Sequence, residues 1–301
     1  MARFSSGSRQ YVAALRLLIV FTVLLGIIYP LAVTAAAQLP GLKSRADGSL
    51  ITRDGRPVGS RVIGQAFTDA KDAPLVQYLQ SRPSAAGTGA TGYDPTSSGA
   101  SNLGPESIVD TLPDPANKGD AGKQSLLSLV CSRSQAVGQL EGVDGSRPFC
   151  TPGGIGAVLS VYHAGPGYQG AILRVVSVNE ACPAKPFVAD YLGVPVQCST
   201  FGQDYTAGRI VPVRGVAPAH PAVPADAVTA SGSGLDPSIS PAYARLQVAR
   251  IAKARAISPA QVLEVITKRT SGRALGFLGE PTVNVLQVNL DLDRAYPYHR
   301  G

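Results

Sequence analysis

The chain has 301 residues, of which 45% are hydrophobic and 16% are charged, and its formal net charge is +7. A chain of this length accommodates one large domain or two small ones. No basic run exceeds two residues, so the positive charge lacks the clustering that nucleic-acid binding requires. The 33 glycines and 24 prolines favour a loop-rich domain over a helical bundle.

An uncharged apolar segment runs from Leu17 to Ala37. About 20 such residues are enough for a helix to cross the hydrocarbon core of a membrane. Arg3, Arg9 and Arg16 precede the segment and no acidic residue does, which predicts that the N-terminus stays in the cytoplasm. We therefore expect a cytoplasmic segment at 1–10, a transmembrane helix at 11–38 and an extracytoplasmic domain at 39–301.

A cleaved signal peptide is the alternative reading of this N-terminus. The basic flank, the apolar run and the alanine-rich residues 32–38 all fit one. A lipoprotein is excluded because the first cysteine is Cys131. The pattern alone leaves anchor and signal peptide open, and in both cases the body of the chain is exported.

The chain has four cysteines, and all of them fall in one segment: Cys131, Cys150, Cys182 and Cys198. An even number of cysteines outside the cytoplasm is typical of disulfides, here with three possible pairings. A zinc site is the alternative, but the spacing contains no CxxC and no histidines repeat nearby. The pattern predicts two disulfides and no metal site.

The first part of the exported region is predicted to be irregular. Residues 61–86 begin with a strand-like run and continue with a short helical pattern around Leu75, Tyr78 and Leu79. Residues 87–105 are almost entirely Gly, Ser, Thr, Asn and Pro. Such a composition is typical of a flexible linker or of a long ordered loop, because glycine permits both.

Residues from about 113 to 221, which we call the inserted segment, have a different texture. Two strand-like runs, 156–162 and 171–178, are joined by the turn-rich sequence HAGPGYQG, which predicts a β-hairpin. Together with the four cysteines, this pattern predicts a disulfide-stapled β-rich element.

The C-terminal third contains two helix starts. Ser240-Pro241 and Ser258-Pro259 each place a capping residue before a proline, and Gln261 completes a capping box. These signals predict helices at 241–256 and 259–269. Residues 282–293 follow, and strict alternation from Leu286 to Asp293 predicts a half-buried strand with Asp291 and Asp293 on its solvated face. Strands with interspersed helices indicate an α+β (mixed α/β) exported domain.

No complete catalytic motif is present. Ser231 and Ser233 lie in SGSG, but the nucleophile elbow G-x-S-x-G needs glycine where residue 231 is serine. The histidines (His163, His220 and His299) are not placed by any motif to act as a base. Phosphate-binding loops of the Walker or dinucleotide type are absent, and Asp236, Asp291 and Asp293 lack calcium-loop spacing. These observations predict no catalytic residues and favour a membrane-anchored partner protein.

Several motifs occur in a characteristic order: after the anchor come VIGQAF (62–67), SRPSAA (81–86), SGASNLGP (98–105), the segment 228–255, and GFLGEPTVNVLQVNLDLD (276–293). With them the chain closely resembles the C subunit of the bacterial Kdp high-affinity potassium-transporting ATPase. The resemblance covers about residues 11–110 and 222–293.

This resemblance implies a single uncleaved transmembrane helix in the plasma membrane. It also implies three partners: a channel-like potassium-translocating subunit, a P-type ATPase catalytic subunit and a small membrane peptide. The complex hydrolyses ATP to import potassium, and in the family this subunit is a catalytic chaperone, needed for assembly, that raises the ATP affinity of the ATPase subunit. ATP and potassium are then handled by the complex, with no cofactor bound stably here.

An exported domain can influence nucleotide binding only indirectly, through coupling to the ATPase subunit, or through the few cytoplasmic residues. A further role compatible with the resemblance is a cap over the outer potassium entrance. The inserted segment departs from the usual family pattern and is of actinobacterial type. It is interpreted as an added interaction surface or lid, or as a stabilising elaboration of an exposed loop, which loops tolerate at low entropic cost.

The matched loops provide the candidates for partner contact. They are Gly64, Gln65, Phe67, Ser81, Arg82, Pro83, Ser101, Asn102, Leu103, Ser231, Gly232, Ser233, Gly234, Leu235 and Asp236. Turn geometry and capping are the alternative explanation for these residues, and they explain Arg82 and Asn102 least well. Two other functions stay open as alternatives: an anchored serine hydrolase and a free-standing binding module built around the inserted segment.

Overall fold

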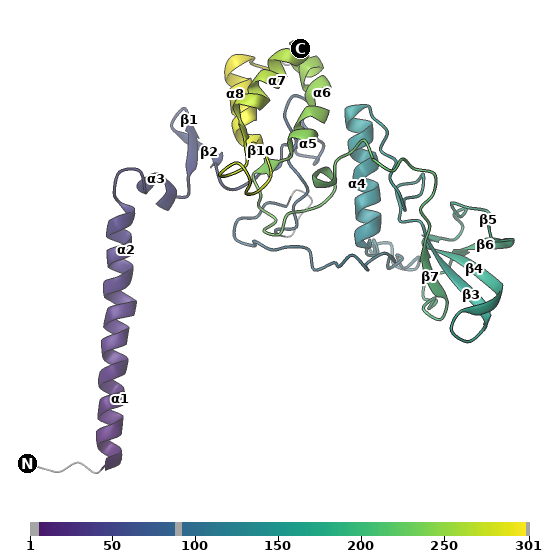
Figure 1. Ribbon diagram of the computed structural model, residues 1–301, viewed down its shortest axis with the longest axis horizontal. Helices are drawn as coiled ribbons and strands as arrows, with labels where there is room; N and C mark the ends of the chain where they lie inside the picture. The colour runs from purple at the N-terminus through teal and green to yellow at the C-terminus, as the bar shows by residue number, and fades with distance from the viewer. Residues whose placement is uncertain (1–5, 88–91, 299–301) are drawn as a thin grey trace, which may run out of the picture. The chain divides into compact units, whose positions relative to one another are not determined.

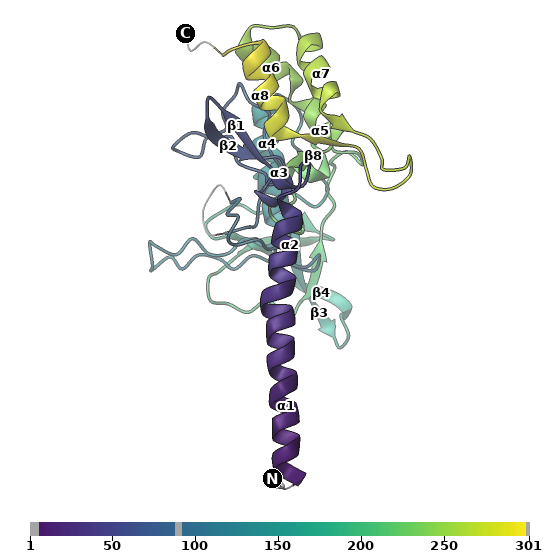
Figure 2. The same cartoon turned by 90° about the vertical axis from the view of Figure 1, so that its left-hand side faces the viewer.

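The computed structural model describes residues 6–87 and 92–298. Arg3 of the basic flank, residues 88–91 of the glycine-rich segment and His299 lie outside the described residues. The chain divides into two compact units, Met1–Val62 and Ile63–Gly301, which are described separately. Figure 1 and Figure 2 show their helices and strands.

The first unit is dominated by one long helix. It comprises α1 (Ser6–Val23), a π-helical turn η1 (Leu24–Ile28) and α2 (Tyr29–Ala37) (Figure 1). Within it, Arg9–Ala37 is long and apolar enough to cross a membrane, and none of it is buried in the protein. Apolar side chains on all sides of an unburied helix are expected of a segment solvated by lipid.

A short helix and a hairpin complete the first unit. Helix α3 (Lys43–Ala46) is followed by β1 (Leu50–Arg53) and β2 (Arg56–Ser60), which pair antiparallel. The connecting residues Asp54 and Gly55 have φ of 51° and 75°. Two central residues with positive φ are what a type I′ hairpin turn requires.

The second unit mixes helices and two sheets, which confirms the α+β prediction. Its elements are α4 (Leu126–Glu141), β3 (Val158–Gly165), β4 (Gln169–Ala181), β5 (Asp190–Tyr191), β6 (Val194–Ser199), β7 (Arg209–Pro212), the 3-10 turn η2 (Ala225–Ala227), β8 (Ser238–Ile239), α5 (Pro241–Leu246), α6 (Val248–Arg255), α7 (Pro259–Lys268), β9 (Thr270–Ser271), β10 (Thr282–Asn284) and α8 (Val285–Ala295).

The inserted segment contains the larger sheet, with strand order β5-β6-β4-β3-β7. The predicted hairpin is confirmed: β3 and β4 pair antiparallel, with Val161 opposite Val175. Strand β6 runs parallel to β4, whereas β7 is antiparallel to β3. Leu159, Val161 and Val175 are fully buried at the centre of this sheet and form its core.

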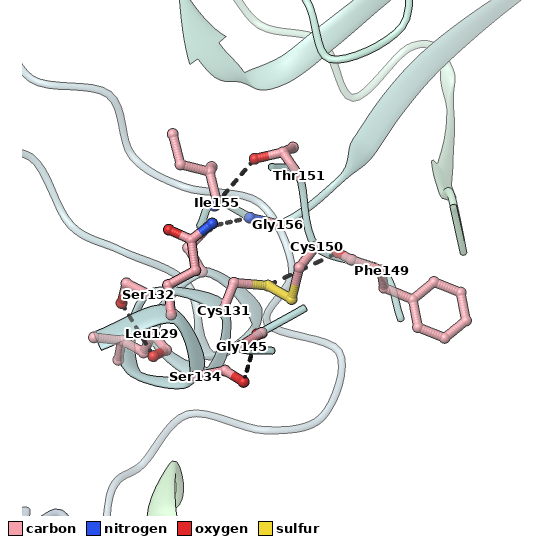
Figure 3. The surroundings of a disulfide bond; sticks show 12 residues. Leu129, Cys131, Ser132, Ser134, Gly145, Phe149, Cys150, Thr151, Ile155 and Gly156 are labelled. Atoms are coloured by element: carbon pink, nitrogen blue, oxygen red, sulfur yellow. Dashed lines mark hydrogen bonds between the residues drawn. A yellow bond between two sulfur atoms is a disulfide. The ribbon is translucent and has the colours of Figure 1, made fainter. Parts of the chain in front are cut away.

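Both predicted disulfides are present. Cys131 in α4 is bonded to Cys150, and Cys182, just after β4, is bonded to Cys198 in β6. Figure 3 shows the first bond, which ties α4 to the segment leading into β3. Helix α4 was not among the predicted elements, although Ser125 caps it by accepting a hydrogen bond from the Ser128 amide at 3.2 Å. All four cysteines are paired in these two bonds.

The predicted helix starts are confirmed in the C-terminal third. Ser240 accepts a hydrogen bond from the Tyr243 amide at 3.0 Å, and Ser258 and Gln261 form a complete capping box. The first predicted helix, 241–256, is divided into α5 and α6 at Gln247. The smaller sheet of this unit has the strand order β8-β10-β9, and its strands come before and after these helices in the sequence.

The predicted strand at 282–293 is wrong beyond its first residues. Strand β10 covers Thr282–Asn284, and helix α8 begins at Val285. The Asn284 side chain caps it by accepting a hydrogen bond from the Gln287 amide at 3.0 Å. Buried Val285, Val288, Asn289 and Leu292 follow helical spacing. The apolar residues of this segment fit both periods. Burial of this face and the hydrogen bonds between Asn289 and Leu79 select the helix, which begins at the Asn284 cap.

The predictions for residues 61–86 are also wrong. This segment forms no helix and no regular strand, and its only ladder contact is an isolated bridge between Thr68 and Pro74. Leu79 is nevertheless completely buried. Local turn hydrogen bonds such as that from the Leu75 amide to the Phe67 carbonyl oxygen hold part of the backbone, and side chains from distant elements hold residues 79 and 80.

Candidate functional site

Four segments that are far apart in sequence meet in the second unit, and we call them the loop framework: residues 64–67, 81–86, 98–99 and 229–236. The Gly64 amide donates to the Leu235 carbonyl oxygen at 2.8 Å, and the Gly99 amide donates to the Ser233 carbonyl oxygen at 3.0 Å. The Ser84 hydroxyl donates to the Gly234 carbonyl oxygen at 2.5 Å. The framework therefore unites the loops that contain most of the predicted contact residues.

Arg82 is the principal side chain within the loop framework. Its Nε and Nη2 donate to the Thr229 carbonyl oxygen at 3.2 and 3.1 Å, and Nη2 also donates to the Ala230 carbonyl oxygen at 3.1 Å. Its Nη1 lies 3.4 Å from Asp236 Oδ2. A planar guanidinium with several donors is suited to such a convergence of backbone oxygens. Arg82 thus cross-links two loops of its own chain.

Tyr93 completes this cluster. Its hydroxyl donates to the Arg82 carbonyl oxygen at 2.8 Å. Burial raises the pKa of Tyr93 to about 12, and the nearby Asp236 carboxylate contributes in the same direction. The phenol therefore stays protonated and continues to donate at any physiological pH.

Two glycines allow the framework segments to approach closely. Gly234 has φ of +69°, and a Cβ at this position would lie 2.7 Å from both the Ala86 amide nitrogen and the Gly99 carbonyl oxygen. A Cβ on Gly64 would lie 2.4 Å from the Tyr93 ring. Side chains at these two positions would push the loops apart. Gly232, in contrast, has no atom within 4 Å of the Cβ position.

The predicted contact residues separate by exposure. Gly64, Phe67 and Gly234 are buried, while Ser101, Asn102, Gly232 and Ser233 are exposed. The half-buried members are Gln65, Ser81, Arg82, Pro83, Leu103, Ser231, Leu235 and Asp236. Partner contact stays a prediction for all of them. The four exposed residues are accessible, whereas Gly64 and Gly234 lie where framework segments approach one another closely.

The SGSG turn shows no arrangement for nucleophilic catalysis within the described residues. The hydroxyls of Ser231 and Ser233 lie 3.4 Å apart, and the Ser233 hydroxyl accepts a hydrogen bond from the Leu235 amide. Neither hydroxyl bonds a histidine there. Residues 6–87 and 92–298 also contain no group of three His, Cys, Asp or Glu side chains able to hold a metal. The geometry is that of a turn stabilised by its own side chains.

Sequence reasoning missed two buried amides that hold the irregular segment at Leu79 and Gln80. The Asn289 side chain accepts from the Leu79 amide at 2.7 Å and donates to the Leu79 carbonyl oxygen at 2.9 Å. Gln247 does the same for Gln80, at 2.6 and 3.1 Å. Each side-chain amide thus pairs with both the N–H and the C=O of one backbone residue, as a neighbouring strand would. The sequence signal was weak: Gln247 lies between Leu246 and Val248, and Asn289 lies between Val288 and Leu290.

Acidic residues of α8 also differ from their prediction. Asp291 and Asp293 do not form a solvated strand face, because α8 directs them to arginines. Asp291 pairs with Arg269 at 2.6 Å, and Asp293 pairs with Arg255 at 2.8 Å. The Arg255 side chain is completely buried, and it also donates to the Gln77 carbonyl oxygen at 2.8 Å.

The matched regions can now be compared with known proteins. The family described as KdpC, K+-transporting ATPase, c chain, matches residues 11–111 and 205–294, which is more than half of the sequence. The chain belongs to the KdpC family.

Relatives described as potassium-transporting ATPase KdpC subunits align over almost the whole length. One from Kineococcus radiotolerans is 39% identical over 289 residues, covering 96% of this chain and 95% of the relative. One from Mycobacterium tuberculosis is 35% identical, covering 95% and 98%. One from Koribacter versatilis is 31% identical, covering 96% of each.

Membership of the KdpC family makes the chain a subunit of a potassium-transporting ATPase complex. The loop framework falls entirely within the two matched regions. Helix α4, strands β3 to β6 and all four cysteines fall in 112–204, between those regions. The framework is therefore the part of the fold that the KdpC pattern describes, and the disulfide-bonded sheet is joined to it.

Proposed function

We propose that this chain is the non-catalytic accessory subunit of an ATP-driven, high-affinity potassium import complex. Its partners are a channel-like potassium-translocating subunit, a P-type ATPase catalytic subunit and a small membrane peptide. Membership of the KdpC family carries this proposal. Further support comes from the unburied apolar helix at Arg9–Ala37.

The orientation proposed is N-terminus inside and bulk of the chain outside. Arg9 and Arg16 flank or begin the apolar segment, and basic residues favour the cytoplasmic side. Two complete disulfides support export, because such bonds persist in oxidising compartments. The long helix then serves as an uncleaved anchor.

Contact with the channel-like subunit is proposed to occur through the exposed tips of the framework loops. Ser101 and Asn102 are exposed just after framework segment 98–99, and Gly232 and Ser233 are exposed within segment 229–236. Loops held on a rigid support are the usual location for recognition. The buried bonds of Arg82 and Tyr93 supply that support, and a domain placed in this way caps the outer potassium entrance.

ATP is proposed to be bound by the catalytic subunit, with no cofactor held stably by this chain. The domain outside the membrane then raises ATP affinity only by stabilising the conformation of the catalytic subunit that binds ATP. Such coupling is reciprocal, so ATP must also strengthen the association of this subunit with the complex.

Co-purification tests the proposal. The tagged full-length chain is isolated in mild detergent from its own membranes after growth in scarce potassium. We expect the three partner subunits and potassium-stimulated ATPase activity to accompany it. A variant in which residues 9–37 are exchanged for an unrelated apolar helix should lose this association. A chain that elutes alone under these conditions contradicts the proposal.

Each alternative function predicts that a different part of the chain is required for activity. A serine hydrolase would lose activity in Ser231→Ala or Ser233→Ala without losing assembly. A free-standing binding module would not need the anchor. We expect both serine variants to retain assembly and ATPase activity.

A further inference from the structure

A cavity of about 810 Å³ lies in the second unit, outside the loop framework. Its walls come from the C-terminal end of α4, the following turn at 143–147, and residues 213–218 after β7. This volume falls within the range of small-molecule sites. Nothing in the potassium-pump role described above uses it.

Arg147 is the cationic residue of the cavity wall. Its Nη2 donates to the Val223 carbonyl oxygen at 2.6 Å, and its Nε is buried without an acceptor among the described residues. No carboxylate within residues 6–87 and 92–298 forms an ion pair with it. Burial also lowers the pKa of Arg147, because it partly desolvates the charge. A guanidinium in this state is stabilised strongly by a bound anion.

The rest of the wall is largely apolar. Phe187 and Val213 are half-buried and pack against the core of the larger sheet. Val216 is completely exposed on the same wall, with no protein covering it. An exposed aliphatic side chain beside half-buried apolar ones provides a surface on which an apolar body can bind.

The charge of the wall restricts the ligand. Arg147 is its basic residue, and Asp144 is its acidic residue. The Asp144 carboxylate accepts hydrogen bonds from the amide and hydroxyl of Ser146, at 2.8 and 2.7 Å, which keep it in its own turn. Removing a dianion from water costs more than removing a monoanion, and one guanidinium without a second cation does not offset the difference.

We propose that this cavity binds a small amphipathic monocarboxylate, with its carboxylate on Arg147 and its apolar body on Phe187, Val213 and Val216. The cavity lies in the part of the chain that carries the disulfide-bonded sheet. The proposal is independent of the potassium-pump role.

The probe is 4-phenylbutyrate, which has one carboxylate and one apolar ring. Binding is measured by equilibrium dialysis against the full-length chain in lipid nanodiscs, with empty nanodiscs as the reference. Two comparison ligands are the uncharged 4-phenylbutanamide and the dianionic phenyl phosphate. We expect saturable one-to-one binding of 4-phenylbutyrate and affinities about tenfold weaker or worse for the other two, because a charge-assisted hydrogen bond is lost or mismatched.

Three variants locate the site. Arg147→Gln and Val216→Asp should each weaken 4-phenylbutyrate binding by about tenfold or more, the first by removing the cation and the second by repelling the anion. Val216 is fully exposed, so its variant remains informative if Arg147→Gln does not fold. The matched control is Arg209→Gln, an exposed arginine of β7 outside the cavity wall, which should bind like the wild type.

Three results would overturn the proposal. The first is equal binding of the acid and the amide. The second is wild-type affinity in the Val216→Asp variant, whether or not the Arg147→Gln variant also keeps wild-type affinity. The third is no saturable binding of 4-phenylbutyrate at millimolar concentrations.

Discussion

Arg250 and Glu141 form an ion pair between α6 and α4, two helices that the sequence separates by 109 positions. Arg250 Nε lies 3.0 and 3.1 Å from the two carboxylate oxygens. The Arg250 side chain is 8% exposed and the Glu141 side chain is not exposed. Arg250 belongs to a region that the KdpC family matches and Glu141 to the intervening one. The pair therefore fastens helix α4 of the inserted segment to helix α6 of the matched region.

Removing Arg250 alone should be costly. In Arg250→Met the Glu141 carboxylate stays buried without its partner, and we expect the free energy of unfolding to fall by about 3–5 kcal/mol. The Arg250→Met, Glu141→Leu double variant should lose less than the sum of the single losses, with a coupling of about 1 kcal/mol or more. Thermal and urea unfolding of the full-length chain in detergent measures both.

The matched control for this cycle is Arg294→Met. Arg294 lies 3.6 Å from Asp291 with its side chain 81% exposed, so its removal should change stability by about 0.5 kcal/mol or less. A loss in Arg250→Met no greater than that in Arg294→Met would contradict the role of the buried pair.

The same carboxylate predicts a pH dependence. Burial raises the pKa of Glu141 above its ordinary value of 4.5, although Arg250 opposes this shift. Between 4.5 and the raised folded-state pKa, the folded chain therefore holds a proton that the unfolded chain has lost. Folding stability must fall as the pH rises through that window and level off above it. As the pH rises through that window, the melting temperature of the wild type should fall relative to that of Glu141→Gln in the same detergent. A difference between the two that does not depend on pH would contradict this prediction.

The Cys131–Cys150 disulfide should stabilise the fold by restricting the unfolded chain. It closes a loop with a sequence separation of 19, for which the expected contribution is about 3 kcal/mol. Cys131→Ala with Cys150→Ala should lower the melting temperature accordingly. Wild type melted with a reductant should behave similarly or worse, because Cys182–Cys198 is reduced as well. An unchanged melting temperature in the double variant would exclude a stabilising role.

Gly234 and Gly232 provide a test of the SGSG turn. Gly234→Ala places a Cβ 2.7 Å from two backbone atoms at a positive φ, and we expect a loss of about 2–3 kcal/mol. Gly232→Ala meets no atom within 4 Å and should change stability by about 0.5 kcal/mol or less. Thermal or urea unfolding of both variants measures the two changes in stability. Equal stability of the two would mean that the close packing of the loop framework is not required.

The loop framework and the buried amides show which parts of this site were predictable. The residues of the loop framework were identified from motifs at 62–67, 81–86, 98–105 and 228–255. Their mutual contacts were not, because hydrogen bonds such as those from Arg82 to residues 229 and 230 depend on how distant loops pack. Gln247 and Asn289 were missed because the partners that their amides need are far away in the sequence.

Local sequence by itself determined the apolar N-terminal helix, the caps at Ser240 and Ser258, the β3–β4 hairpin and the number of disulfides. Each of these depends on side chains within a few residues, or on composition and compartment. Tertiary structure alone decided how the cysteines pair, that Val285–Ala295 is a helix, and that residues 61–86 are irregular. In the two segments, more than one local conformation satisfies the same apolar pattern, and burial against distant elements, with its hydrogen bonds, selects between them. The pairing of the cysteines depends on which parts of the chain the fold brings together.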